Sequence, residues 1–200
     1  MKEGIKLLKC KRYIIKIVST MLIASTLFTG CSSKSANAGT LNNTQTQSTV
    51  IESYFTTRDG NLDKILIREI NSAQQELDVA IYTITKPDIA NAIVDAKNRN
   101  VAVKIITDKE NSQSKYEQSL LNLFKKNNIP VKVNSHEGLM HLKLTIIDGK
   151  TVLGGSYNYT KQATENNDEN LLVIRDKYIV SDYMTEFAAM WSDTKNYMNY

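Results

Sequence analysis

Between residues 50 and 200, apolar runs of strand length alternate with segments whose apolar residues recur at helical spacing. The runs predict strands at 50–56, 77–84, 101–107, 131–134, 142–147, 151–153 and 171–174, of which those at 77–84 and 101–107 are expected to be covered on both faces. Apolar residues three or four positions apart predict helices near 62–73, 89–96, 116–124 and 180–191. This alternation predicts an α/β fold with a mixed, largely parallel sheet and helices on both of its faces.

The connection between the strands predicted at 142–147 and 151–153 differs from the others. It contains Asp148 and Gly149, a dipeptide typical of tight hairpins. The two strands are therefore expected to pair antiparallel, which makes the predicted sheet mixed.

The first thirty residues have the pattern of an export signal. Six cations and one acid precede a twelve-residue apolar run at 17–28, the cations being Lys2, Lys6, Lys9, Lys11, Arg12 and Lys16. A bilayer-spanning helix needs about 20 apolar residues, so this run is too short to span. Cations, a short apolar run and then small residues predict a signal peptide over 1–30. A buried helix of the fold is the alternative, which the cations disfavour.

The sequence Leu27-Phe28-Thr29-Gly30-Cys31 resembles the lipobox of bacterial lipoproteins, although Phe28 stands where that family usually has leucine. The resemblance implies that Cys31 becomes a lipidated first residue, and that the protein is exported and anchored to the cell membrane outside the cytoplasm. Cleavage after Ala38 is the alternative and would give a secreted protein. Residues 31–49 are polar and predict a flexible tether to a domain at 50–200.

The net charge of +4 belongs to the N-terminus. Residues 1–30 hold six of the 25 Lys and Arg residues and one of the 21 acids, which leaves 19 cations against 20 acids in 31–200. The overall charge of the predicted domain therefore gives no argument for nucleic-acid binding.

Candidate chemistry begins in the strand predicted at 142–147. Alternate side chains of a strand share a face, so His141, Lys143 and Thr145 are expected to point the same way. An imidazole beside an ammonium group suits a phosphate, because one can attack or donate a proton while the other holds negative charge. The solvated face of an edge strand would show the same pattern, and these residues alone do not exclude it.

Polar groups in the following segments strengthen the phosphate hypothesis. Gly154 and Gly155 allow the backbone to approach an anion closely, and Ser156 and Asn158 share a strand face and can donate hydrogen bonds. A carboxylate at Glu169, just before the strand at 171–174, could hold an imidazole in one tautomer. An aromatic ring near the site could also stack on a base, although core packing is commoner for such rings, the candidates being Tyr54, Tyr82, Tyr157 and Tyr159.

The series H-x-K-x4-D, then G-S-x-N, then a glutamate before a strand resembles the phospholipase D superfamily, in particular its single-motif, Nuc-like endonuclease branch. The resemblance covers residues from about 50 to 196. It implies a phosphohistidine intermediate on His141 and an orienting role for Glu169. It also implies phosphate binding by Lys143, Ser156 and Asn158. Asp148 completes the catalytic motif, but its strand parity and its place in a turn indicate a mainly structural role.

One motif is half of such a site, because the two-step reaction needs a second imidazole as proton donor and base. His136 is the only other histidine, and no lysine follows it at the second position. The family's solution is a homodimer in which two copies of the motif share one active site. We expect no metal and no cofactor, because lysines and Ser/Asn donors supply the electrostatics and the acids do not cluster with histidines.

The sequence therefore predicts a metal-independent phosphodiesterase, with a non-specific endonuclease acting on DNA or RNA as the leading hypothesis. A phospholipase D that hydrolyses phospholipid head groups is the alternative, and the predicted lipid anchor would suit it. A surface lipoprotein that binds without catalysis is the third hypothesis, against which the complete set of motif residues argues.

Overall fold

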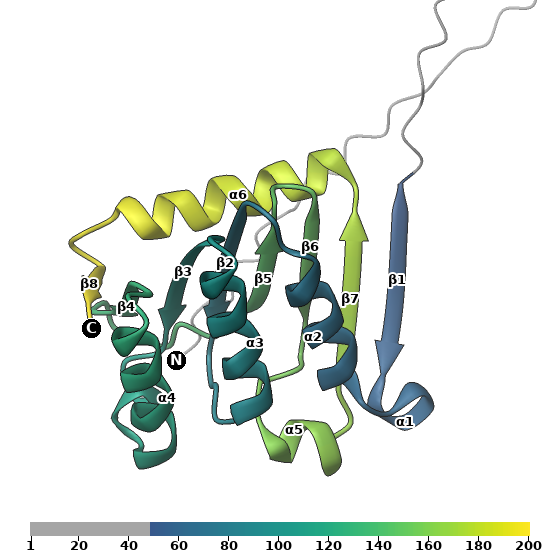
Figure 1. The fold of residues 1–200 in the computed structure, drawn as a ribbon, viewed down its shortest axis with the longest axis horizontal. Helices are drawn as coiled ribbons and strands as arrows, with labels where there is room; N and C mark the ends of the chain where they lie inside the picture. The colour runs from purple at the N-terminus through teal and green to yellow at the C-terminus, as the bar shows by residue number, and fades with distance from the viewer. Residues whose placement is uncertain (1–48) are drawn as a thin grey trace, which may run out of the picture. The chain divides into compact units, whose positions relative to one another are not determined.

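The computed structural model describes residues 49–200, whose arrangement Figure 1 shows. The predicted signal peptide (1–30), Cys31 and almost all of the tether (31–49) lie outside the described residues. The strands are β1 (Val50–Phe55), β2 (Glu76–Ile81), β3 (Ala102–Thr107), β4 (Val131–Asn134), β5 (Lys143–Ile147), β6 (Thr151–Gly155), β7 (Asn170–Arg175) and β8 (Tyr197–Asn199). The helices are α1 (Thr56–Asp59), α2 (Leu62–Ser72), α3 (Pro87–Asn98), a 3₁₀ turn (Asn111–Gln113), α4 (Lys115–Lys126), α5 (Lys161–Glu165) and α6 (Lys177–Ser192).

The strands form one mixed sheet in the order β1-β7-β6-β5-β2-β3-β4-β8. Only β2–β3 and β3–β4 pair parallel within residues 49–200, and the remaining neighbours pair antiparallel. The mixed α/β class is confirmed, but the expectation of a largely parallel sheet is wrong. Parallel neighbours need a crossover, and here α3 and α4 provide the crossovers for these two pairs. Continuous apolar runs report that both faces are covered, and antiparallel strands covered on both faces produce them as well.

Helices cover both faces of the sheet, as the sequence predicts. Residues of α2, α3 and α4 pack with Leu77, Val79 and Ile81 of β2 in one buried cluster. On the opposite face, α6 packs with a second cluster that includes Ala80 and Ile106. Figure 1 shows α6 running across the sheet from β7 toward β8. No helix among residues 49–200 is long and apolar enough to cross a membrane.

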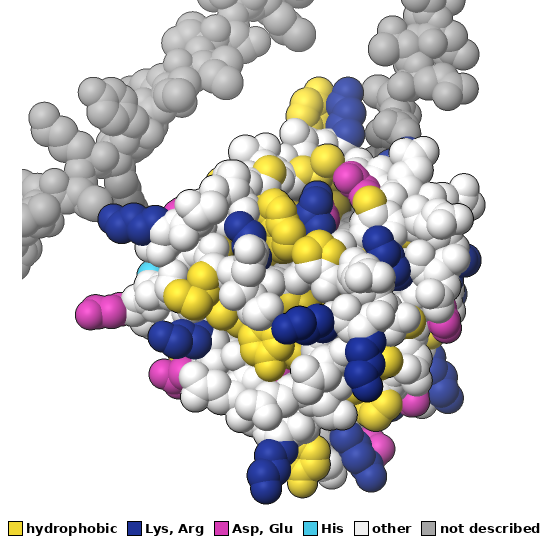
Figure 2. Space-filling view, turned by 60° about the vertical axis from the view of Figure 1, so that its left-hand side comes forward, with side chains coloured by type: hydrophobic (Ala, Val, Ile, Leu, Met, Phe, Trp, Pro, Cys, Tyr) yellow, Lys and Arg dark blue, Asp and Glu magenta, His cyan; other side chains and the backbone are white. Residues whose placement is uncertain are grey.

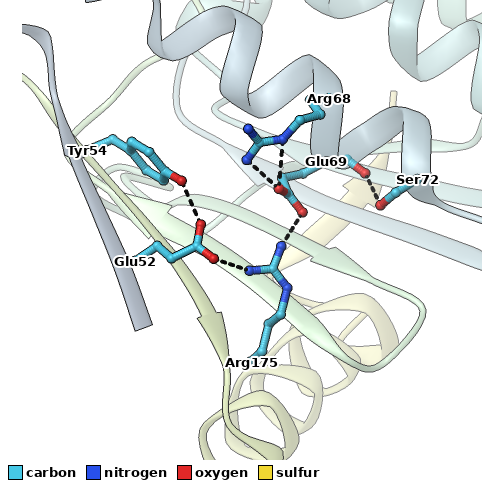
Figure 3. A network of polar contacts seen from close by, with 6 residues as sticks. All are labelled: Glu52, Tyr54, Arg68, Glu69, Ser72 and Arg175. Atoms are coloured by element: carbon cyan, nitrogen blue, oxygen red, sulfur yellow. Dashed lines mark hydrogen bonds and ion pairs between the residues drawn. The ribbon is translucent and has the colours of Figure 1, made fainter. Parts of the chain in front are cut away.

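A polar network fixes β1 and β7 to α2 (Figure 3). The buried carboxylate of Glu69 accepts hydrogen bonds from Arg175 at 2.7 Å and from Arg68 at 2.8 Å. Arg175 also donates to Glu52 at 3.1 Å, and Glu52 accepts the hydroxyl hydrogen bond of Tyr54 at 2.6 Å. Because Arg175 is the last residue of β7, this network fixes the C-terminal end of that strand.

The antiparallel pairing of β5 brings several strand ends together. The first residue of β5, Lys143, lies opposite Ile81, the last residue of β2. On the other side, Gly154 near the end of β6 pairs with Leu144, and Gly155 pairs with Leu171 at the start of β7. The predicted chemistry of His141, Ser156 and Glu169 therefore falls at one edge of the sheet.

Candidate active site

Lys143 is the first residue of β5, and His141 lies two residues before the strand. His141 is exposed, whereas Lys143 is half-buried and its Nζ donates a hydrogen bond to the His141 carbonyl oxygen at 2.8 Å. Burial lowers the pKa of Lys143, while the nearby charge of Glu169 acts in the opposite direction. Further along the strand, the buried hydroxyl of Thr145 lies 2.6 Å from that of Tyr159. The imidazole of His141 and the ammonium group of Lys143 thus lie at the N-terminal end of β5, while the other residues of the strand are buried.

Tyr82 forms one wall beside these two residues. Its ring centroid lies 4.4 Å from that of His141, with the two planes tilted by 57°. The Lys143 ammonium nitrogen lies 4.7 Å from the centre of the same ring. Among the tyrosines that the sequence suggested, Tyr157 and Tyr159 are wholly buried, and Tyr82 is the one placed against His141.

Ser156 and Glu169 meet at the ends of β6 and β7. The Ser156 hydroxyl donates a hydrogen bond to Glu169 Oε2, and Asn167 donates to Oε1 at 3.0 Å. The Ser156 Oγ accepts the Asn170 backbone N–H at 3.1 Å, and the Ser156 N–H reaches Asn170 Oδ1 at 2.9 Å. Within the described residues, the Glu169 carboxylate is therefore bonded to Ser156 and Asn167 and not to His141.

Asn158 lies between two buried tyrosines that fix its backbone. The Tyr159 N–H bonds to the Thr83 carbonyl at 3.1 Å, and the Tyr157 hydroxyl lies 2.6 Å from that of Thr164. The Asn158 Oδ1 is buried and has no hydrogen-bond partner among residues 49–200. Unpaired buried polar atoms are rare in native folds and call for an explanation, a catalytic role being one of the possibilities.

Asp148 lies at the opposite end of β5 from His141. Its φ of 52° places it in the left-handed turn that Gly149 continues, at a φ of 59°. Its carboxylate accepts the backbone N–H groups of Gln74, Gln75 and Glu76 at distances between 2.7 and 3.2 Å. Burial raises the pKa of Asp148, but these three hydrogen bonds outweigh that effect and hold the pKa below its usual value. This placement favours the structural interpretation of Asp148 over a catalytic one.

Two buried side chains that the sequence analysis missed hold the segment leading to His141. Asp108 accepts the Met140 N–H at 3.0 Å, one residue before His141. Asn134 accepts the Lys109 N–H at 2.8 Å and donates to the Gly138 carbonyl at 3.0 Å. The sequence offered one signal for Asp108, because this acid directly follows the apolar run at 101–107, and functional side chains are common at strand ends.

Glu117 is a third missed residue, and it holds the backbone of the segment that follows Tyr82. The side chain comes from α4 and is completely buried. It accepts the Thr107 hydroxyl at 2.6 Å and the Ile84 N–H at 3.3 Å. Burial raises the pKa of Glu117 to about 7, against the lowering effect of these two hydrogen bonds, and the negative charge of Asp108 adds to the rise.

His136 does not join the site. Its ring lies edge-on to Tyr197 of β8, with centroids 5.6 Å apart, and its Nδ1 lies 2.7 Å from the Glu137 carbonyl oxygen. Residues 49–200 also contain no group of three or more His, Cys, Asp or Glu side chains placed to hold a metal ion.

A family model described as "Cardiolipin synthase, PLD-like domain" matches residues 66–191, and the chain belongs to this family of PLD-like domains. The structure resembles the phospholipase D family member Nuc from Salmonella typhimurium, with a TM-score of 0.70 and 27% identity over 76% of this chain and 99% of that one. It also resembles NucT from Helicobacter pylori, with a TM-score of 0.67 and 28% identity over 76% of this chain and 100% of that one.

Curated relatives are similar over a smaller part of their length. A mitochondrial cardiolipin hydrolase from Chlamydomonas reinhardtii is 34% identical over 61% of this chain and 54% of that protein. A phospholipase D from Rickettsia bellii is 32% identical over 70% of this chain and 68% of that protein. The chain spans little more than half the length of the first of these relatives.

The two neighbouring glycines of β6 are predicted to differ in their tolerance of a side chain. Gly155 has a φ of 148°, and a Cβ there would lie 2.4 Å from the Asn170 carbonyl oxygen, whereas at Gly154 the nearest atom would be 3.9 Å away. We expect Gly155→Ala to lower the free energy of unfolding by about 2 kcal/mol, and Gly154→Ala to change it by less than about 0.5 kcal/mol. Urea unfolding of both variants measures this, and equal effects would contradict the predicted clash.

Glu117 is predicted to make stability depend on pH. Its pKa is about 7 in the folded protein and 4.5 as the unperturbed value. The folded state therefore binds the Glu117 proton more tightly than the unfolded state does. The stability that this proton contributes is complete below about pH 4.5 and is lost as pH rises to about 7. The loss amounts to roughly 3 kcal/mol.

Glu117→Gln cannot ionise and removes this dependence. Urea unfolding at pH 4.5 and pH 7.5 measures the difference in stability between wild type and variant at each pH. We expect that difference to move in favour of the variant at pH 7.5. A difference that is the same at both pH values would show that Glu117 does not titrate in this range.

Proposed function

We propose that the chain is a metal-independent phosphodiesterase that cleaves DNA or RNA through a phosphohistidine intermediate on His141. The observation that carries the proposal is the meeting of His141, Lys143, Ser156 and Glu169 at one edge of the sheet. The exposed imidazole is free to attack phosphorus, and the ammonium group beside it can hold a phosphate oxygen.

The hydrogen bond between Ser156 and Glu169 suggests how the site responds to substrate. With Glu169 as its acceptor, the Ser156 hydroxyl is not yet free to donate to a phosphate. When a phosphate oxygen arrives, the hydroxyl turns to it, and the Glu169 carboxylate becomes available to the His141 imidazole. One exchange of hydrogen bonds thus combines phosphate binding by Ser156 with the orienting role proposed for Glu169, and Asn158 supplies a further amide.

A second copy of the chain completes the proposed site. The leaving oxygen needs a proton donor, and His136 has Tyr197 as its ring neighbour and not His141. Two exposed leucines flank the nucleophile: Leu139 is 47% exposed and Leu142 is 38% exposed. A homodimer with His141 of both copies at one shared site would cover these side chains and supply the missing imidazole.

Nucleic acid is the leading substrate because the similarity covers nearly the whole of the Nuc proteins but only about half of the first cardiolipin hydrolase. The similarity extends over 99% and 100% of Nuc and NucT, but over 54% of the first cardiolipin hydrolase. Charge adds little, because residues 31–200 hold 19 cations against 20 acids. On the one face drawn in Figure 2, the Lys and Arg side chains are spread among apolar ones and do not form one stripe. Recognition would therefore rest on the phosphate group itself.

Phospholipid is the second candidate substrate. The curated relatives carry the names cardiolipin hydrolase and phospholipase D. The proposed location is the outer side of the cell membrane, with a lipid anchor at Cys31, or the medium if cleavage follows Ala38. An anchored enzyme would have head groups within reach of His141.

The activity is tested with the full-length chain, supercoiled plasmid and EDTA. We expect wild type to nick the plasmid and His141→Ala to lose at least about 100-fold in rate, because the nucleophile is gone. His136→Ala is the matched control and should nick like wild type. Loss of wild-type activity in EDTA, restored by a divalent ion, would contradict metal independence.

Parallel tubes offer vesicles of phosphatidylcholine or of cardiolipin to the same proteins. Head-group release that depends on His141, without nicking, would assign the chain to the phospholipases. If wild type and His141→Ala behaved equally on every substrate, the hypothesis of a surface protein that binds without catalysis would replace the proposed function.

The homodimer is tested by sedimentation together with activity. We expect wild type to sediment as a dimer and Leu139→Glu to shift to monomer with at least about tenfold lower activity, because a buried charge without a partner disfavours the interface. Tyr116→Glu is the control, since Tyr116 is 79% exposed on α4. A monomer that keeps full activity would contradict the shared site.

A further inference from the structure

The ring of Tyr82 contacts both residues on which the proposed reaction depends. It lies against the His141 imidazole, at 4.4 Å between centroids, and under the Lys143 ammonium group, at 4.7 Å. His141 is otherwise an exposed side chain just outside the strand. An exposed imidazole of this kind would rotate among several rotamers, most of which point its nitrogens away from a phosphate.

The backbone on either side holds Tyr82 in place. Its N–H donates to the Leu142 carbonyl at 2.8 Å, which continues the pairing of β2 with β5. On the other side of β2, the Thr107 hydroxyl donates to the Ile81 carbonyl at 2.9 Å, and Glu117 accepts the Ile84 N–H at 3.3 Å. The ring is therefore carried by a segment fixed on both sides by buried groups.

The ring and not the hydroxyl makes these contacts. No hydrogen bond joins the Tyr82 hydroxyl to another residue of the part of the chain that the structure describes, whereas the ring meets an imidazole and a cation. Aromatic rings attract both kinds of group through the negative charge of their faces. A phenylalanine at this position would keep both contacts.

We propose that Tyr82 is a positioning residue that sets the direction of the His141 imidazole and the location of the Lys143 ammonium group. The inference rests on the proposed function for the roles of these two residues. A misplacement of about 1 Å of a reacting group can cost about 100-fold in rate, so the loss of the ring should lower turnover more than substrate binding.

The kinetic test compares Tyr82→Phe and Tyr82→Leu with wild type on bis(p-nitrophenyl) phosphate, a phosphodiester that needs neither bases nor lipid. We expect the Phe variant to stay within about twofold of wild type, and the Leu variant to lose about 10- to 100-fold in kcat with KM changed less than about threefold. Tyr197→Leu is the matched control, because Tyr197 contacts the ring of His136. It should leave kcat unchanged.

The spectroscopic test uses the two histidines of the chain, in protein purified without a histidine tag. The His141 ring-proton signals, assigned by their absence from His141→Ala, should move in Tyr82→Leu and stay in Tyr82→Phe. The His136 signals should move only in Tyr197→Leu.

Several results would overturn the role of Tyr82. These are His141 signals that do not move in Tyr82→Leu, full kcat in that variant, or a Phe variant as slow as the Leu variant. A wild-type chain that cleaves no phosphodiester would instead overturn the proposed function, and the histidine signals would still decide whether the ring contact exists.

Discussion

The position of β5, antiparallel to both β2 and β6, determines which side chains meet at the candidate site. Its first residue lies beside the end of β2, which brings Tyr82 to His141 and Lys143. Its pairing with β6, and that of β6 with β7, places Ser156 and Glu169 at the same edge. Residues far apart in the chain thus meet at one edge, the proposed phosphate-binding site, because of strand direction.

Buried polar groups hold the backbone beside this edge through hydrogen bonds. Asp108, Glu117 and Asn134 would each be costly to bury alone, but each holds backbone N–H groups that have no partner in the sheet. Asp108 fixes the residue before His141, and Glu117 fixes the segment after Tyr82. The backbone next to His141, the proposed nucleophile, and the backbone after Tyr82 are therefore held by buried carboxylates, while the His141 side chain itself stays exposed.

Strand parity and turn chemistry were enough to predict the local part of the site. The alternation of His141, Lys143 and Thr145 and the turn at Asp148 both follow from neighbours in sequence. Strand direction could not be predicted, because apolar runs report burial only, and the sheet is mostly antiparallel. Tyr82 was one of several candidate rings, since its contact with His141 depends on the pairing of β2 with β5. In the sequence, Glu117 has the pattern of an exposed side chain on a helix, and only the packing of α4 in the folded protein shows that it is buried.

The stereochemistry at phosphorus tests most directly whether His141 forms a covalent bond to the phosphorus atom, as proposed. The full-length chain would cleave an oligonucleotide with one phosphorothioate linkage of known configuration in ¹⁸O-labelled water. Two successive displacements, first by His141 and then by water, predict net retention of configuration in the product. Inversion would mean that water attacks directly, and would contradict the phosphohistidine mechanism.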